Sequence, residues 1–134
     1  MKTSILIAVI FLCSSFVSAS ASPVKSPVLV SESKSLLPAF SFLRGHKQGR
    51  NYTITWGMTS NTGISHFIVK CTYEDPYDIY SVWQQIGIVP ATNSPIFKFI
   101  DSPVLPGTLN YRIIAVMTNN VTTITSGIHT TIIR

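Results

Sequence analysis

From about Leu37 onward, apolar and polar residues alternate with a period of two, and this period predicts β-strands. In NYTITWG the aromatic and aliphatic positions are separated by threonines, and in NYRIIAV the residues Tyr111, Ile113 and Ala115 share one face. These stretches are rich in Thr, Ile, Val and Tyr, which favour strands. No stretch has the pattern of an amphipathic helix with caps.

Turn-forming clusters divide this pattern into separate strands. Groups of Gly, Pro, Asn and Asp recur in RGHKQGRN, GMTSNTG, YEDPYD, VPATNSP and SPVLPGT. They delimit seven strands, at about 37–44, 51–57, 64–73, 80–89, 95–101, 108–117 and 121–133. That number of short strands over about 100 residues predicts an all-β sandwich.

The N-terminal segment differs in composition from the rest. Lys2, the apolar run ILIAVIFLC and the small residues SASA are typical of a secretory signal peptide over residues 1–21, cleaved after Ala21 or one residue earlier. The Ser-rich residues 22–36 are expected to be a flexible lead-in to one domain at 37–134. We therefore expect a secreted protein, outside the cell or at its surface, with no membrane span once the signal is removed.

Charge and cysteine content narrow the possible partners. The formal charge is +5, one unit of it from Lys2, but the Lys and Arg residues are dispersed, so we expect no nucleic-acid partner. Cys13 lies in the predicted signal peptide, so Cys71 is the single cysteine expected after cleavage, and no intrachain disulfide is predicted. Leu12 stands where lipoprotein signals carry a small residue, which disfavours lipidation of Cys13 but leaves it open.

Four stretches together resemble a fibronectin type III domain from about Leu37 to Ile133. YTITW is similar to the second strand of that family, with Trp56 as its core tryptophan, and ISHFIVKCTYED is similar to the third. SVWQQIGIV, with Trp83, resembles the fourth. FKFIDSPVLPGTLNYRIIAV resembles the family most, through its aromatic-x-Asp ending, its Pro-Gly turn and the strand containing Tyr111. The resemblance implies a seven-stranded antiparallel immunoglobulin-like sandwich with Trp56, Trp83 and Tyr111 in its core.

The resemblance implies a structural role for Tyr111. At this position the family has a tyrosine corner, whose ring packs in the core and whose hydroxyl bonds a nearby backbone group. A tyrosine acting as general acid needs a charged partner, and the pattern places none beside it. Domains of this family have no active site and serve as spacers, adhesion modules or recognition surfaces. RGH at 44–46 is not the RGD adhesion tripeptide and lies in a different loop.

Candidate catalytic and metal-binding groups are sparse. Cys71 shares the inward face of its strand with Phe67 and Val69, whereas His66 points to the opposite face, so the two are not expected to form a nucleophile–base pair. No two histidines have the spacing of a zinc pair on one strand. We therefore expect no catalytic residues, no metal and no cofactor, and a protein that is not an enzyme.

Two local motifs leave alternatives open. The acidic stretch EDPYD, Glu74 to Asp78, is interpreted as a solvated turn shaped by Pro76, with Ca²⁺ binding as the alternative. The turn is favoured because the stretch lacks the Gly and Asp frame of a calcium loop. Asn51 and Asn120 begin N-glycosylation sequons, and their use stays open.

An outward-facing patch on one sheet is the candidate binding site. Its apolar members come from the strands at 64–73 and 108–117, and basic residues border them. The patch comprises His66, Ile68, Lys70, Arg112, Ile114 and Val116. Exposed apolar patches often mark contact surfaces, although single exposed aliphatic residues are common in strands.

These features predict a secreted, non-catalytic fibronectin type III-like module for adhesion or recognition, whose partner is an extracellular protein or a surface glycan. A carbohydrate-binding module is the alternative, because Tyr77 and Tyr80 beside the acidic turn offer rings for stacking on a sugar. A small secreted hydrolase is less well supported, since the chain has few carboxylates and no catalytic motif. The oligomeric state stays open.

Overall fold

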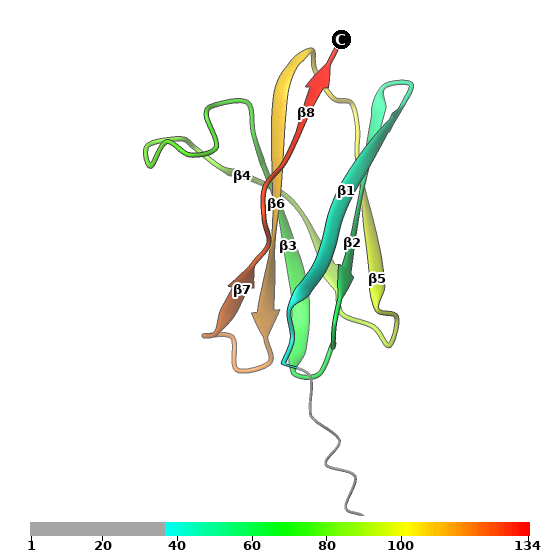
Figure 1. Ribbon diagram of the computed structural model, residues 1–134, viewed down its shortest axis with the longest axis vertical. Coiled ribbons are helices and arrows are strands. Elements are labelled where there is room, and N and C mark those ends of the chain that lie inside the picture. The colour runs from blue at the N-terminus through cyan, green and yellow to red at the C-terminus, as the bar shows by residue number, and fades with distance from the viewer. Residues whose placement is uncertain (1–36) are drawn as a thin grey trace, which may run out of the picture. The chain divides into compact units, whose positions relative to one another are not determined.

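The computed structural model describes residues 37–134, and in that part of the chain it contains antiparallel strands and no helix (Figure 1). The predicted all-β class is confirmed. The predicted signal peptide, lead-in and Cys13 lie outside the described residues. Within the described range, no segment forms a helix of the length and apolarity that crossing a membrane requires.

The described strands form two sheets (Figure 1). The first sheet has the order β1-β2-β5 and is made of β1 (Phe40–Gln48), β2 (Asn51–Met58) and β5 (Ile96–Asp101). The second has β3 (Ile64–Thr72) and β6 (Gly107–Met117) at its centre, with β4 (Gln84–Pro90) beside β3. On the other side of β6 lie β7 (Thr123–Thr125) and β8 (His129–Ile133).

The two sheets pack on a shared aromatic core. Trp56 from β2 meets Phe67 from β3 edge-on, with ring centroids 5.5 Å apart, and Phe67 also packs on Phe97 from β5 at 4.5 Å. Trp56 and Phe67 are fully buried, and Phe97 is 6% exposed. Aromatic pairs of this kind contribute beyond their buried area, so this cluster joins the two layers of a β-sandwich.

The inward positions follow the period of two that the sequence predicts. On the central strands the apolar residues of one parity have no exposed surface, while the residues between them are partly exposed except for Asn110, which is buried. The buried set comprises Ile54, Trp56, Phe67, Val69, Leu109, Tyr111, Ile113 and Ala115. A slip of one residue in any of these strands would turn this set to solvent, so the core fixes the register.

Ser126 divides the strand predicted at 121–133 into β7 and β8. Its amide donates to the carbonyl oxygen of Ile113 at 2.8 Å, and its hydroxyl accepts a hydrogen bond from the amide of Ile113, also at 2.8 Å. The serine side chain thus takes the place of a backbone group in the ladder with β6. The described residues therefore form eight strands instead of the predicted seven.

Gly87 allows the edge of one sheet to approach the other. A Cβ atom at this position in β4 would lie 2.2 Å from the ring of Phe99 in β5, which occupies that space. Phe99 is partly buried and packs against the core. The glycine is therefore required by packing, because any side chain would displace the ring.

Candidate functional site

Tyr111 is buried against a carboxylate. Its hydroxyl donates to Oδ2 of Asp101 at 2.8 Å, ten residues upstream at the end of β5, and its ring has no exposed surface. The sequence-based expectation of a backbone partner is therefore wrong. The carboxylate lies in the stretch FKFID, but the tyrosine corner that the resemblance implies predicted a backbone partner.

The surroundings of Tyr111 oppose acid chemistry. Burial raises the pKa of its hydroxyl, and the hydrogen bond to Asp101 and the negative charge of that carboxylate raise this pKa further. A catalytic tyrosine needs a pKa shifted towards the working pH, which is the opposite direction. The Asp101–Tyr111 pair therefore acts as a structural contact between β5 and β6.

A second buried polar contact lies beside the first. Tyr52 stacks on Tyr111 and its hydroxyl is 2.7 Å from Nε2 of His129. Burial lowers the pKa of His129 below its ordinary value, which favours the neutral ring. The two tyrosines thus carry polar contacts from β5 to β8 through the interior of the sandwich.

Cys71 and His66 do not form a pair. Cys71 faces the core opposite Tyr111 and is 5% exposed, whereas His66 lies opposite Val116 and its Nδ1 is 3.1 Å from Oγ of Ser65. Burial, with the nearby charge of Asp101, raises the pKa of the Cys71 thiol to about 11. A reactive cysteine needs a lowered pKa and access, so Cys71 has the properties of a core residue.

The acidic stretch is a turn held by its own carboxylates. Oδ1 of Asp75 accepts from the amide of Tyr77 at 3.0 Å, and Oδ1 of Asp78 accepts from Tyr80 at 2.9 Å. Oε2 of Glu74 accepts from the amide of Val82 at 2.7 Å. Over residues 37–134, no three His, Cys, Asp or Glu side chains gather as metal ligands. These carboxylates stabilise the backbone of the β3–β4 loop, which favours the turn interpretation.

The β3–β4 loop, residues 73–83, carries large apolar side chains into solvent. Figure 1 shows this loop, in green, projecting away from the sheets. Tyr77 and Tyr80 are 81% and 84% exposed, and Ile79 and Val82 are 87% and 65% exposed. Of these four residues, the sequence indicated only Tyr77 and Tyr80 as rings available for binding; Ile79 had no predicted role, and Val82 was expected within a strand.

Trp83 lies outside the core, contrary to the expectation from the resemblance. It is partly exposed, and the guanidinium carbon of Arg112 lies 4.2 Å from the centroid of its ring. The physical reason is that β4 begins only at Gln84, so Trp83 ends the loop and covers the outer face of the second sheet. Trp56, by contrast, is fully buried as expected.

The strand register brings the six residues of the predicted patch next to one another, and five of them reach that outer face. In the β3–β6 register, Ile68 pairs with Ile114, Lys70 with Arg112 and His66 with Val116. Val116, however, is only 7% exposed and does not belong to the surface.

Ile88 of β4 extends the apolar part of this face. It pairs with Ile68 and is 55% exposed. We call Ile68, Ile88 and Ile114 the isoleucine row. Ile88 was missed because the sequence did not reveal how β4 aligns with β3.

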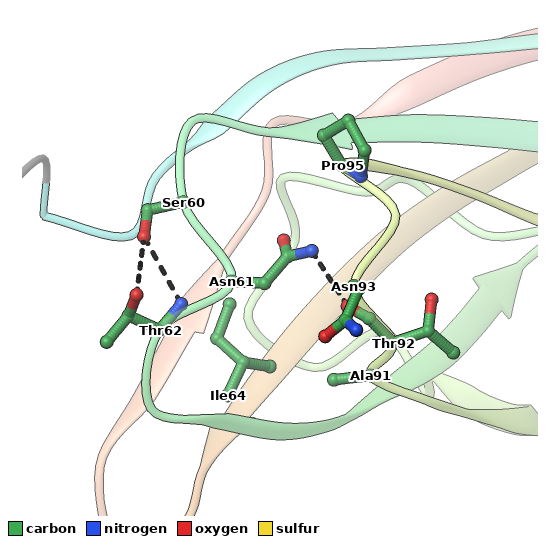
Figure 2. Close-up of a pocket in the computed structure, with 8 residues that line it drawn as sticks. All are labelled: Ser60, Asn61, Thr62, Ile64, Ala91, Thr92, Asn93 and Pro95. Atoms are coloured by element: carbon green, nitrogen blue, oxygen red, sulfur yellow. Dashed lines mark hydrogen bonds between the residues drawn. The ribbon is translucent and has the colours of Figure 1, made fainter.

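A hollow of about 540 Å³ lies between the β2–β3 and β4–β5 loops (Figure 2). Asn61 spans it and donates from Nδ2 to the carbonyl oxygen of Thr92 at 3.0 Å. The hollow is lined by Ser60, Asn61, Thr62, Ile64, Ala91, Thr92, Asn93 and Pro95. None of these side chains ionises near neutral pH, so the hollow offers hydrogen bonds but no acid–base pair.

Comparisons with known proteins give no family assignment. No protein-family model matches the chain, and a search of curated proteins finds no matching sequence. The structure defines the protein at the level of its class, an all-β protein of two antiparallel sheets.

Proposed function

We propose that the protein is a secreted, non-catalytic recognition module of fibronectin type III type that binds an extracellular protein. The proposed contact surface runs from the β3–β4 loop over Trp83 to the isoleucine row. The observation that carries the proposal is the exposure of Tyr77, Ile79, Tyr80 and Val82 on a loop whose backbone is fixed by hydrogen bonds.

The strand order supports the fibronectin part of the proposal. In an immunoglobulin-type sandwich, the first, second and fifth strands share one sheet, and the third, sixth and seventh share the other. Here β1, β2 and β5 share a sheet, as do β3, β6 and β7, while β4 joins β3. The motifs around Trp56 and Tyr111 agree with the same arrangement.

The loop supports the recognition part. Removing one large apolar side chain from water contributes about 1.5–3 kcal/mol, so four exposed residues offer a substantial gain on binding. A loop that is already ordered loses less conformational entropy when it binds. Tyrosine, tryptophan and arginine are also the residues that dominate protein interfaces, and Trp83 with Arg112 adjoins the loop.

Affinity capture with paired variants tests the proposal. The chain is immobilised and exposed to the extracellular fraction of its source, and captured proteins are quantified by mass spectrometry. The double substitution Ile79→Ser and Tyr80→Ser should lose the partner. Val121→Ser, which alters a residue 83% exposed on the β6–β7 turn, should keep it. A partner retained equally by both variants would contradict the proposed surface.

Carbohydrate binding is a second candidate, favoured by the exposure of Tyr77 and Tyr80. Exposed tyrosine rings stack on sugars when they face the same ligand. A glycan array probed with the wild-type chain and with Tyr77→Ala tests it. Binding to a defined glycan that is lost in Tyr77→Ala would favour this function over protein recognition.

A further inference from the structure

Two cations face each other on the outer side of the second sheet. Lys70 of β3 lies directly opposite Arg112 of β6. Their strand neighbours Val69, Cys71, Tyr111 and Ile113 face the core, so both basic side chains project outward. Like charges placed directly opposite each other across two strands are destabilising. An anion between them would remove this repulsion.

The acidic side chains of residues 37–134 are engaged elsewhere. Glu74, Asp75 and Asp78 accept hydrogen bonds from amides of the β3–β4 loop, and Asp101 accepts from the hydroxyl of Tyr111. The residue that pairs with Lys70 on its other side is Gln85, which is neutral. The described part of the chain therefore supplies no carboxylate bonded to this pair of cations.

Trp83 fixes the orientation of the arginine. The guanidinium lies over the ring, and its Nε is buried without a hydrogen-bond partner in the described residues. A guanidinium stacked on an aromatic face still donates within its own plane, and with Nε buried the edge formed by Nη1 and Nη2 is the one left for a planar, bidentate partner. Arg112 is thus held in place before any ligand arrives.

We propose that Lys70 and Arg112 form an oxyanion site that binds a carboxylate of the protein partner. The two N–H groups of the arginine edge would donate to the two carboxylate oxygens, and the lysine ammonium would add a third donor. The identification of the ligand as part of a protein rests on the proposed function. A protein carboxylate is favoured over a sulfated polysaccharide because the strands of this sheet carry no other Lys or Arg, and the isoleucine row adjoins the two cations.

A titration followed by nuclear magnetic resonance tests the site. The ¹⁵N-labelled full chain is titrated with N-acetyl-glutamate α-amide and, in parallel, with the neutral N-acetyl-glutamine α-amide. Concentrations up to roughly 500 mM at constant ionic strength are needed, because a solvent-exposed ion pair is weak. The glutamate compound should cause saturable shifts of the Arg112 Nε–H and Trp83 indole N–H signals, and the glutamine compound should not. Equal shifts with both compounds would overturn the proposal.

Variants of Lys70 and Arg112 test whether these two cations bind the glutamate compound. Arg112→Gln should abolish the shift of the Trp83 indole, and Lys70→Gln should weaken binding several-fold. Lys98→Gln, on β5 in the other sheet, should change nothing. If Arg112→Gln does not fold, as judged from its amide spectrum, Lys70→Gln carries the test. Shifts unchanged in the folded variants would contradict the site.

Two further measurements distinguish carboxylate binding at Lys70 and Arg112 from capture of a protein partner by the β3–β4 loop. Inorganic sulfate that binds more tightly than the glutamate compound would indicate a polysaccharide ligand and overturn the carboxylate assignment. Retained carboxylate binding in the Ile79→Ser, Tyr80→Ser variant is expected, because the probe does not need the loop. The anion site therefore stands or fails in this assay independently of partner capture by the loop.

Discussion

Tyr52 and Tyr111 stack across the interior with ring centroids 5.4 Å apart and planes within 7° of parallel. They belong to different sheets, and their hydroxyls bond to different partners, one to His129 and one to Asp101. The stack therefore places two hydrogen-bonded ionisable pairs inside a largely apolar core. Stability, rather than chemistry, is what these contacts should govern.

Removal of the Tyr111 hydroxyl should destabilise the fold. Tyr111→Phe keeps the stacked ring but leaves the carboxylate of Asp101 without its donor, which costs about 1–3 kcal/mol. Urea unfolding followed by tryptophan fluorescence measures the change. Tyr80→Phe, on an exposed ring, is the matched control and should be neutral. Equal stability of wild-type and Tyr111→Phe would show that the contact adds nothing.

Stability should fall at alkaline pH through Cys71. Its pKa is raised to about 11 in the folded protein by burial, so between pH 9 and 11 the unfolded chain loses this proton while the folded chain keeps it. A full unit of separation corresponds to about 1.4 kcal/mol. Unfolding midpoints in urea at pH 8 and pH 10.5 measure the loss, which should be smaller in Cys71→Ala. The buried thiol should also resist thiol reagents until the protein unfolds.

His129 should make the fold sensitive to mild acid. Its folded-state pKa is lowered by burial, so below pH 6.5 the unfolded chain takes up a proton that the folded chain refuses. The free energy of unfolding should therefore be independent of His129 protonation above pH 6.5, and it should decrease as the pH falls towards the folded-state pKa of His129. Thermal unfolding of wild-type and His129→Gln between pH 7.5 and 5.5 compares the slopes. If the stability of His129→Gln fell with pH as steeply as that of the wild type, another titrating group would be the cause.

Gly87→Ala should disturb the packing of the sheet edges. The added methyl group overlaps the ring of Phe99, and overpacking of this kind costs about 1–3 kcal/mol. Gly127→Ala is the control, because nothing lies within 4 Å of the added Cβ. In a double-mutant cycle, Phe99→Ala should relieve most of the cost of Gly87→Ala. Additive effects of the two substitutions would argue against the clash.

The isoleucine row gives a prediction for binding. Ile114→Asp replaces a partly exposed side chain at the β6 end of the row, and it should leave folding intact while weakening capture of the partner. Circular dichroism checks the fold, and the capture assay checks binding. Undiminished binding would confine the contact surface to the β3–β4 loop.

The period of two was sufficient to predict the inward faces of the central strands, because burial and alternation are coupled in a sheet. It could not locate Trp83, since the position of that ring depends on where the loop ends and β4 begins. The period of two also could not identify Asp101 as the partner of Tyr111. The two residues lie on strands of different sheets, and only the path of the β5–β6 connection brings them together. The exposure of Ile79 and Val82 was unpredictable for a similar reason: it follows from side-chain capping of the loop by Asp75, Asp78 and Glu74.

The break at Ser126 bears on how the protein behaves at high concentration. Sheet margins with a long unpaired backbone recruit other chains and start fibrils. Because Ser126 splits the C-terminal margin, β7 offers three residues and β8 offers five, with a bend between them. A neighbouring molecule finds no uninterrupted template there, so crowding should be tolerated without polymerisation along that margin.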